Sequence, residues 1–162
     1  MTIAKGDKLP GANLIEMTAD GPASVDIAAR VAGKTIVIFG VPGAFTGTCT
    51  SAHVPSFMRT KPDFDAKGVD EVICVSVNDP FVMSAWGEST GATDAGLTML
   101  ADPAGTFASA LGLGFDAPPV GFHGRFKRSA MIVRDGTVTE VQVEDSPGVC
   151  NVTAGEALLE AI

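Results

Sequence analysis

Cys49 is the residue of this sequence whose surroundings most favour chemistry. It lies in VPGAFTGTCTSAHVPSF (41–57), directly after the apolar run KTIVIFG (34–40), and it opens a predicted helix. The first N–H groups of a helix lack intrahelical acceptors, and the helix dipole is positive at that end. Both effects stabilise a thiolate, which is the nucleophilic form of cysteine. The position predicts a reactive cysteine, with a buried packing residue as the alternative. We expect Thr46 or Thr48 to cap this turn.

The other histidine and cysteine positions have weaker signals. His53 follows Cys49 by four residues and shares its helical face, so it either tunes the thiolate or bonds to local backbone. Cys74 lies inside a predicted buried strand, where cysteine is usually a small apolar residue. Cys150 precedes the last predicted helix and is expected near the surface. No C-x-x-C or H-x-x-H spacing occurs, so we expect no metal site.

Apolar runs alternate with helical patterns along the chain, which predicts an α/β fold. The expected strands are 35–41, 69–78, 97–102, 128–133 and 137–144, and the expected helices are 49–67, 79–90, 105–112 and 153–162. The last two strands form a predicted hairpin around the turn at 134–136, the second with the alternating pattern of a half-buried edge. The order favours one domain, residues 1–162, with a mixed central sheet and helices on both faces. A thioredoxin-like arrangement fits this order, although the order alone does not identify it.

The ends of these elements carry more specific expectations. Asn78 or Asp79 is the predicted N-cap of the 79–90 helix, and Thr153 that of the last helix, with Glu156 completing a capping box. Pro62 is a candidate break in the 49–67 helix. Residues 113–126, with two adjacent prolines, are predicted to form a loop.

Composition excludes some classes of partner. The chain has 162 residues, 46% of them hydrophobic, and a formal net charge of −8. So acidic a chain is a poor ligand for nucleic acid or anionic membranes. The sparse, odd set of three cysteines argues against a secreted disulfide framework. No run of signal-peptide or membrane-spanning type is visible, so we expect a cytoplasmic protein.

Several segments resemble the peroxiredoxin family, specifically its peroxiredoxin-5 or type II subgroup. The stretch PGAFTGTCTSAHVP contains the family's active-site pattern P-x-x-x-T-x-x-C. The resemblance continues through VSVNDPFVMSAWG (75–87), LADPAGTFASALGL (100–113) and RFKRSAMIVRDGTV (125–138). It covers most of the chain in register, and it implies a thioredoxin-like fold.

The resemblance implies roles for individual residues. Cys49 matches the peroxidatic cysteine, which attacks a peroxide and becomes a sulfenic acid. Thr46 matches the threonine whose hydroxyl bonds to peroxide and thiolate, and Pro42 the proline that shields the sulfur from water. Arg128 matches the arginine that reaches the cysteine, with the N–H of Thr48 as a further donor.

Two further positions follow from the same comparison of motifs. His53 matches a histidine that supports the site, and Gly47 stands where the family has proline. Arg125, three residues before Arg128, is expected to be a surface charge, with an accessory role at the site as the alternative.

The implied activity is reduction of hydrogen peroxide and organic hydroperoxides by a thiol donor, glutathione with glutaredoxin or thioredoxin, without a bound cofactor. Cys150 is either a resolving cysteine that forms a disulfide with Cys49 or an idle thiol. A homodimer is implied, with contacts at the active-site loops and around Trp86. Two alternatives remain: a redox sensor on the same fold, and a cysteine-nucleophile hydrolase or amidotransferase.

Overall fold

The computed structural model describes residues 1–162 and contains nine strands with short helices between them. The strands are β1 (Asn13–Thr18), β2 (Gly21–Asp26), β3 (Thr35–Val41), β4 (Glu71–Ser76), β5 (Thr98–Ala101), β6 (Gly114–Ala117), β7 (Phe122–Phe126), β8 (Ser129–Arg134) and β9 (Thr137–Val143). The α-helices are α1 (Ile27–Val31), α2 (Val54–Ala66), α3 (Pro80–Thr90), α4 (Thr106–Ala110) and α5 (Gly155–Glu160). A π-helix, η1 (Cys49–His53), precedes α2, and a 3₁₀ turn, η2 (Pro118–Val120), joins β6 to β7.

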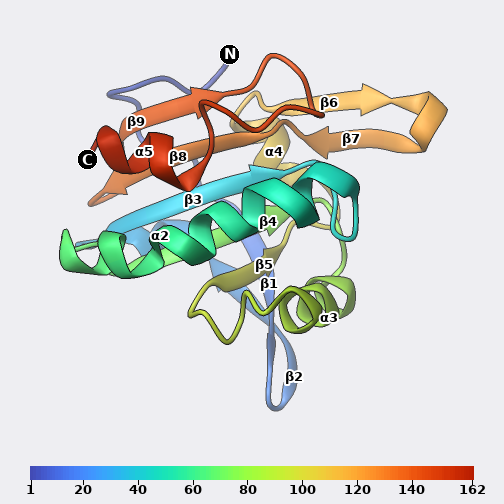
Figure 1. Cartoon of the computed structure of the whole chain (residues 1–162), viewed down its shortest axis with the longest axis horizontal. Helices are drawn as coiled ribbons and strands as arrows, with labels where there is room; N and C mark the ends of the chain where they lie inside the picture. Colours follow the sequence, from blue (N-terminus) through green and yellow to red (C-terminus); the bar gives the residue numbers. More distant parts are fainter.

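Seven strands form one mixed sheet in the order β2-β1-β5-β4-β3-β8-β9 (Figure 1). The central strands β3, β4 and β5 are parallel; β8 pairs antiparallel with β3, and β9 pairs antiparallel with β8. The central strands are buried on both faces, which explains why β3 and β4 are continuous apolar runs. The expected mixed sheet is therefore confirmed.

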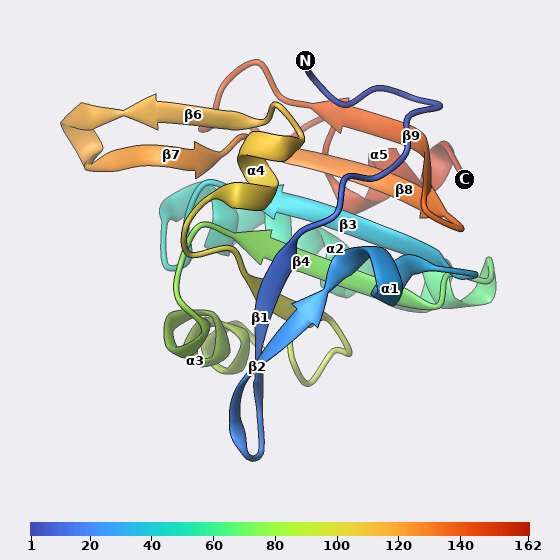
Figure 2. The ribbon, with the colours of Figure 1, turned by 180° about the vertical axis from the view of Figure 1, so that it is seen from behind.

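Helices cover both faces of this sheet, as expected. The core on one face joins α2, α3 and α5 to the inward residues of β3 and β4, with Phe57 and Trp86 among the largest side chains. The core on the other face joins α1 and α4 to the same strands and includes Phe107 and Phe126. Figures 1 and 2 show these two faces in turn. No helix in the structure combines the length and apolar character needed to cross a bilayer.

Two hairpins are absent from the sequence-based expectation. The strands β1 and β2 precede every expected element, and β6 and β7 replace the expected loop at 113–126. The β6–β7 hairpin projects from the body of the molecule (Figure 1). Asp116 accepts the N–H of Gly124 at 2.6 Å, and Phe115 meets Phe122 edge-on. The two prolines lie in the turn η2, where missing N–H groups cost no ladder bond.

Helix ends agree with expectation in one case and differ in two. Asp79 caps α3 by accepting the N–H of Val82 at 2.8 Å. The predicted cap at Thr153 is wrong: α5 begins at Gly155, and the Thr153 hydroxyl donates instead to Glu144 at 3.0 Å. Pro62 does not break α2, which continues to Ala66.

Candidate active site

Cys49 begins a π-helix that follows β3 after a short loop. The loop turns at Phe45, whose φ of 62° places it in the left-handed region. The carbonyl of Thr46 accepts the N–H of Thr50 at 3.1 Å, whereas the N–H groups of Thr48 and Cys49 bond to no acceptor in the protein. The expected side-chain cap is wrong for both threonines, because neither hydroxyl accepts an N–H of this turn. The helix start therefore offers two free donors beside the thiol.

The structure brings Arg128 to Cys49 across 79 residues of sequence. Nη2 of Arg128 donates to Sγ of Cys49 at 3.2 Å. Cys49 is fully buried and Arg128 is only 2% exposed. A hydrogen bond donated by a charged guanidinium is stronger than one between neutral groups.

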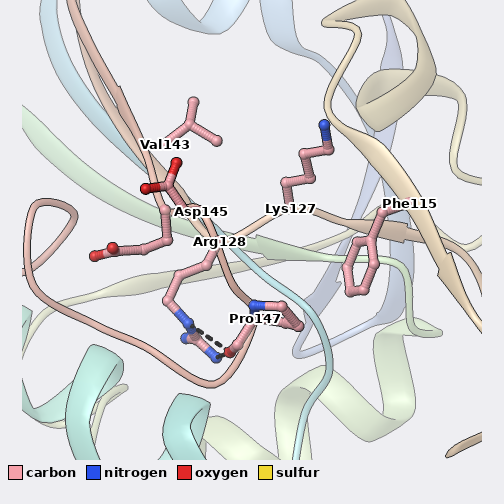
Figure 3. A pocket seen from close by; sticks show the side chains of 7 residues that line it. Phe115, Lys127, Arg128, Val143, Asp145 and Pro147 are labelled. Atoms are coloured by element: carbon pink, nitrogen blue, oxygen red, sulfur yellow. Dashed lines mark hydrogen bonds between the residues drawn. The ribbon is translucent and has the colours of Figure 1, made fainter.

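Arg128 is held from two further sides. Its Nε and Nη2 both donate to the carbonyl oxygen of Pro147, at 3.1 and 2.8 Å (Figure 3). Its Nη1 donates to Nδ1 of His53 at 3.1 Å. A guanidinium carries five N–H groups, and the four bonds to Pro147, His53 and Cys49 leave one without a protein acceptor. That last N–H is available to a bound oxygen.

His53 is neutral in this arrangement. Its Nε2 lies 2.9 Å from the carbonyl oxygen of Thr153, which can only accept, so Nε2 carries the hydrogen and Nδ1 is the acceptor for Arg128. Burial lowers the pKa of His53 to about 3, with a further lowering from the charge of Arg128. The bond to Thr153 opposes this shift.

Pro42, Thr46 and Thr48 lie around the approach to the sulfur, but none bonds to it. The Thr46 hydroxyl donates to the Gly43 carbonyl at 2.6 Å, and the Thr48 hydroxyl donates to the Gly148 carbonyl at 3.1 Å. The expected bond between Thr46 and the thiolate is thus absent from this structure. Pro42 is buried beside them.

A cavity of about 420 Å³ opens over these residues. Its walls are Pro42, Thr46, Gly47, Thr48, Val120, Phe122, Arg128, Pro147 and Gly148. A second cavity of about 380 Å³ shares Arg128 and Pro147 with the first, and Lys127 and Asp145 also line it (Figure 3). The first cavity is large enough for a small peroxide and leads to the guanidinium that holds the sulfur.

Arg125 contributes to the site, although the sequence favoured a surface charge. It is half-buried rather than a surface charge, and its Nη1 donates to the carbonyl of Pro42 at 3.1 Å. Its guanidinium also lies over the ring of Phe122, 4.8 Å from the centroid. Arg125 and Arg128 were expected to point to opposite faces of one strand, but β7 ends at Phe126 and β8 begins at Ser129, so the two arginines do not share a strand.

The remaining cysteines differ in their surroundings. Cys74 is fully buried in β4, as expected, and burial raises the pKa of its thiol. Cys150 is half-buried in the segment between β9 and α5, and burial raises the pKa of its thiol too. All three cysteines are free thiols.

We call residues 144–154, between β9 and α5, the strap. Three of its carbonyl groups bond to side chains around the sulfur: Pro147 to Arg128, Gly148 to Thr48, and Thr153 to His53. Glu144 closes the strap on itself, because its Oε1 accepts the N–H and the hydroxyl of Thr153 at 3.1 and 3.0 Å. The strap that carries Cys150 is therefore anchored on the site of Cys49.

A thioredoxin-like sheet with a buried cysteine at a strand-to-helix turn defines a thiol-based redox protein. The family model described as Redoxin matches residues 4–159. A chloroplastic peroxiredoxin-2E-2 of Oryza sativa is 42% identical over 99% of this chain and 73% of its own length.

Solved structures agree with this match. Reduced Prx3 of Vibrio vulnificus in complex with H₂O₂ is 43% identical, covers 99% of both chains and has a TM-score of 0.92. Peroxiredoxin 5 of Alvinella pompejana is 30% identical, covers 98% of this chain and 97% of its own, and has a TM-score of 0.85. The chain belongs to the peroxiredoxin family and is a thiol-dependent peroxidase.

Proposed function

We propose that Cys49 is the peroxidatic cysteine and that Arg128 positions both its thiolate and the incoming peroxide. The observation that carries this is the 3.2 Å bond from Arg128 to the sulfur, beneath a cavity walled by Pro42, Thr46 and Thr48. The Vibrio vulnificus relative, solved in complex with H₂O₂, supports hydrogen peroxide as a substrate. Alkyl hydroperoxides share the same reacting group, and the apolar wall residue Val120 is compatible with a small alkyl chain.

The chemical step oxidises the sulfur by two electrons. The Cys49 thiolate attacks the terminal peroxide oxygen, an S–O bond forms, and the O–O bond breaks. The electron pair of that bond stays on the departing oxygen, which takes a proton and leaves as water or an alcohol. Cys49 is left as a sulfenic acid.

Stabilising the departing oxygen contributes more than ionising the thiol. A cysteine is already a few per cent thiolate at pH 7, so complete ionisation can raise the rate only some tens-fold. Removing one preorganised donor from an oxyanion site costs roughly a hundred- to a thousandfold. The available donors are the fifth N–H of Arg128 and the free N–H groups of Thr48 and Cys49. Thr46, whose own proton goes to Gly43, acts as the acceptor for the peroxide O–H.

The sulfenic acid is then reduced by a thiol. We propose glutathione with glutaredoxin, or thioredoxin, as the outside donor, and Cys150 as the internal one. The strap supports the internal route, because its carbonyls bond to Arg128, Thr48 and His53 and so keep Cys150 near the site. Condensation of the Cys150 thiol with the Cys49 sulfenic acid gives a disulfide and releases water.

One mass measurement tests both steps. Reduced protein receives one equivalent of hydrogen peroxide, and its intact mass is taken before and after. We expect a loss of two hydrogens, which Cys150→Ser converts to a gain of one oxygen and Cys49→Ser abolishes. Cys74→Ser is the matched control and leaves the result unchanged. A gain of one oxygen in the unsubstituted protein would contradict the internal route alone; an unchanged mass would contradict the role of Cys49.

We further propose that the chain works as a homodimer in the cytoplasm. Three of the six exposed large apolar side chains are Phe45 at 58%, Phe81 at 65% and Val120 at 67%. The loop after β3, the helix α3 and the β6–β7 turn that carry them lie at one end of the molecule (Figures 1 and 2). Trp86, expected near the interface, is fully buried, so Phe81 of the same helix is the better contact. Three free thiols suit a reducing compartment.

A further inference from the structure

We propose that His53 is a positioning residue that orients the Arg128 guanidinium against Cys49 and couples it to the strap. The inference rests on the proposed role of Cys49 and adds to it a residue that acts through Arg128. His53 lines neither cavity, and both of its ring nitrogens are occupied by other groups. It therefore does not exchange protons with the peroxide.

The ring is locked in one orientation and one tautomer. Its centroid lies 5.0 Å from the ring of Phe39 and 5.6 Å from that of Phe57, so aromatic packing restricts rotation. The carbonyl of Thr153 accepts from Nε2, which leaves the Nδ1 lone pair facing Nη1 of Arg128. The acceptor for the guanidinium is thus fixed by a residue 100 positions away.

The other two partners of Arg128 are less permanent. The sulfur of Cys49 changes chemically during turnover, and the carbonyl of Pro147 belongs to the strap, which must move if Cys150 is to reach the sulfur. His53 is the last residue of η1, packs against Phe39 and Phe57 of one core, and changes in neither way. Its Nδ1 is the constant partner that keeps the guanidinium aimed at the sulfur when the other bonds change.

Two substitutions of His53 distinguish the roles of its two ring nitrogens. His53→Asn places an amide near Nδ1 and keeps an acceptor for Arg128, whereas His53→Gln places an amide near Nε2 and keeps a donor for Thr153. The rate of oxidation by hydrogen peroxide is followed by stopped-flow fluorescence of Trp86, the one tryptophan in a chain without tyrosine. Its indole N–H bonds to Thr50, next to Cys49. The strap is followed by the rate at which iodoacetamide alkylates Cys150, measured on the isolated peptide by mass spectrometry.

Each substitution is expected to change one of the two rates and to leave the other unchanged. H53Q slows oxidation about tenfold or more, as expected for loss of a hydrogen bond to a charged group, and leaves alkylation of Cys150 unchanged. H53N keeps an oxidation rate close to that of the unsubstituted protein and speeds alkylation of Cys150 severalfold. Equal effects of the two substitutions on both rates, or no effect of either, would overturn the inference. Failure of the unsubstituted protein to react with peroxide would instead overturn the proposed function on which it rests.

A double-mutant cycle tests that His53 acts through Arg128. We expect H53Q to slow an Arg128→Lys protein far less than it slows the unsubstituted one, whereas additive slowing would count against the proposal. Circular dichroism shows first whether each variant folds. If H53Q or H53N does not fold, His53→Ala is assayed with and without added imidazole. Recovery of the oxidation rate with imidazole supports the positioning role, and no recovery overturns it.

Discussion

The hydroxyl of Thr46 shows how a single hydrogen bond can define a catalytic role. The family resemblance implies that this hydroxyl bonds to both peroxide and thiolate, but here its proton is committed to the carbonyl of Gly43 at 2.6 Å. Only its lone pairs remain for a ligand. Because the sulfur attacks the terminal oxygen, an acceptor that binds the peroxide O–H orients the O–O bond for displacement.

Replacing Thr46 by valine removes this acceptor while conserving shape. We expect Thr46→Val to lower the rate of Cys49 oxidation by roughly ten- to a hundredfold, from the loss of one positioning hydrogen bond in the transition state. Thr46→Ser, which keeps the hydroxyl, is the matched control and retains most of the rate. Stopped-flow fluorescence of Trp86 with excess hydrogen peroxide measures both. An unchanged rate in the valine variant would exclude the assigned role.

The junction between β3 and the helix is the element that exposes the donors. Phe45 turns the chain with a positive φ, and Thr48 and Cys49 enter the π turn with free N–H groups. Non-glycine residues in this backbone region are strained and are held there by their surroundings. The side-chain amide of Asn78 supports the loop by accepting the N–H of Ala44 at 3.0 Å.

Gly47 stands where the family has proline, so the backbone of this junction has more conformations open to it than a proline would allow. Its N–H bonds to no acceptor, and a Cβ at this position would meet open space. We expect Gly47→Pro to raise the free energy of unfolding by about 0.4–1 kcal/mol, by restricting the unfolded chain. Gly47→Ala is the control without the fixed φ. Urea denaturation of the three proteins measures the difference, and a destabilised proline variant would show that the loop here cannot take the proline geometry.

In the proposed internal route, the strap is the element on which reduction of the Cys49 sulfenic acid depends. Glu144 closes it by accepting the N–H groups of Asn151 and Thr153. The helix α5 packs behind it, and the N–H of Gly155 donates to the hydroxyl of Ser56 at 2.9 Å. A Cβ on Gly155 would lie 2.6 Å from the carbonyl oxygen of Ser56, so only glycine allows this approach. The strap is therefore held at both ends and also at Pro147 and Gly148, whose carbonyls bond to Arg128 and Thr48, and Cys150 lies between these attachments.

Across the folded chain, the site lies where β3, α2, β8 and the strap meet on one face of the sheet. His53 is buried there as a neutral base, with a pKa lowered to about 3 by burial and by the charge of Arg128. In the unfolded chain, the pKa of histidine is about 6.5. The unfolded state thus binds more protons than the folded state between pH 6.5 and 3, and stability falls as the pH falls through that window.

Stability should therefore depend on pH through His53. We expect the free energy of unfolding to fall by about 2 kcal/mol more in the unsubstituted protein than in H53N between pH 7 and pH 5, because only the former can be protonated at this position when unfolded. Burial acts to raise the pKa of Glu71, but its bonds to Arg30 and Thr98 lower it, and its contribution is common to both proteins. Urea denaturation at the two pH values measures the difference; equal falls would contradict a neutral His53.

Much of the fold was predictable, since buried parallel strands leave an unambiguous pattern. The runs 35–41 and 69–78 are apolar because both faces of β3 and β4 are covered. The hairpins β1–β2 and β6–β7 were missed because their strands are half exposed and interrupted by glycine and proline. The capping box at Thr153 matched in spacing, yet a carboxylate nine residues earlier competes for the same hydroxyl.

The sequence by itself determined that a cysteine stands between a strand and a helix, after a proline and a threonine at the spacing of a peroxide-reactive thiol. It also named Arg128 as a partner, though only by resemblance of motifs. Only the tertiary structure decided which hydrogen bonds these groups make. Thr46 donates to the carbonyl of Gly43, the carbonyl of Thr153 sets the tautomer of His53, and Arg128 donates to the carbonyl of Pro147 in the strap. The physical reason is that the direction of a hydrogen bond depends on its partner, and these partners include backbone carbonyls far along the chain, which carry no signature in residue type.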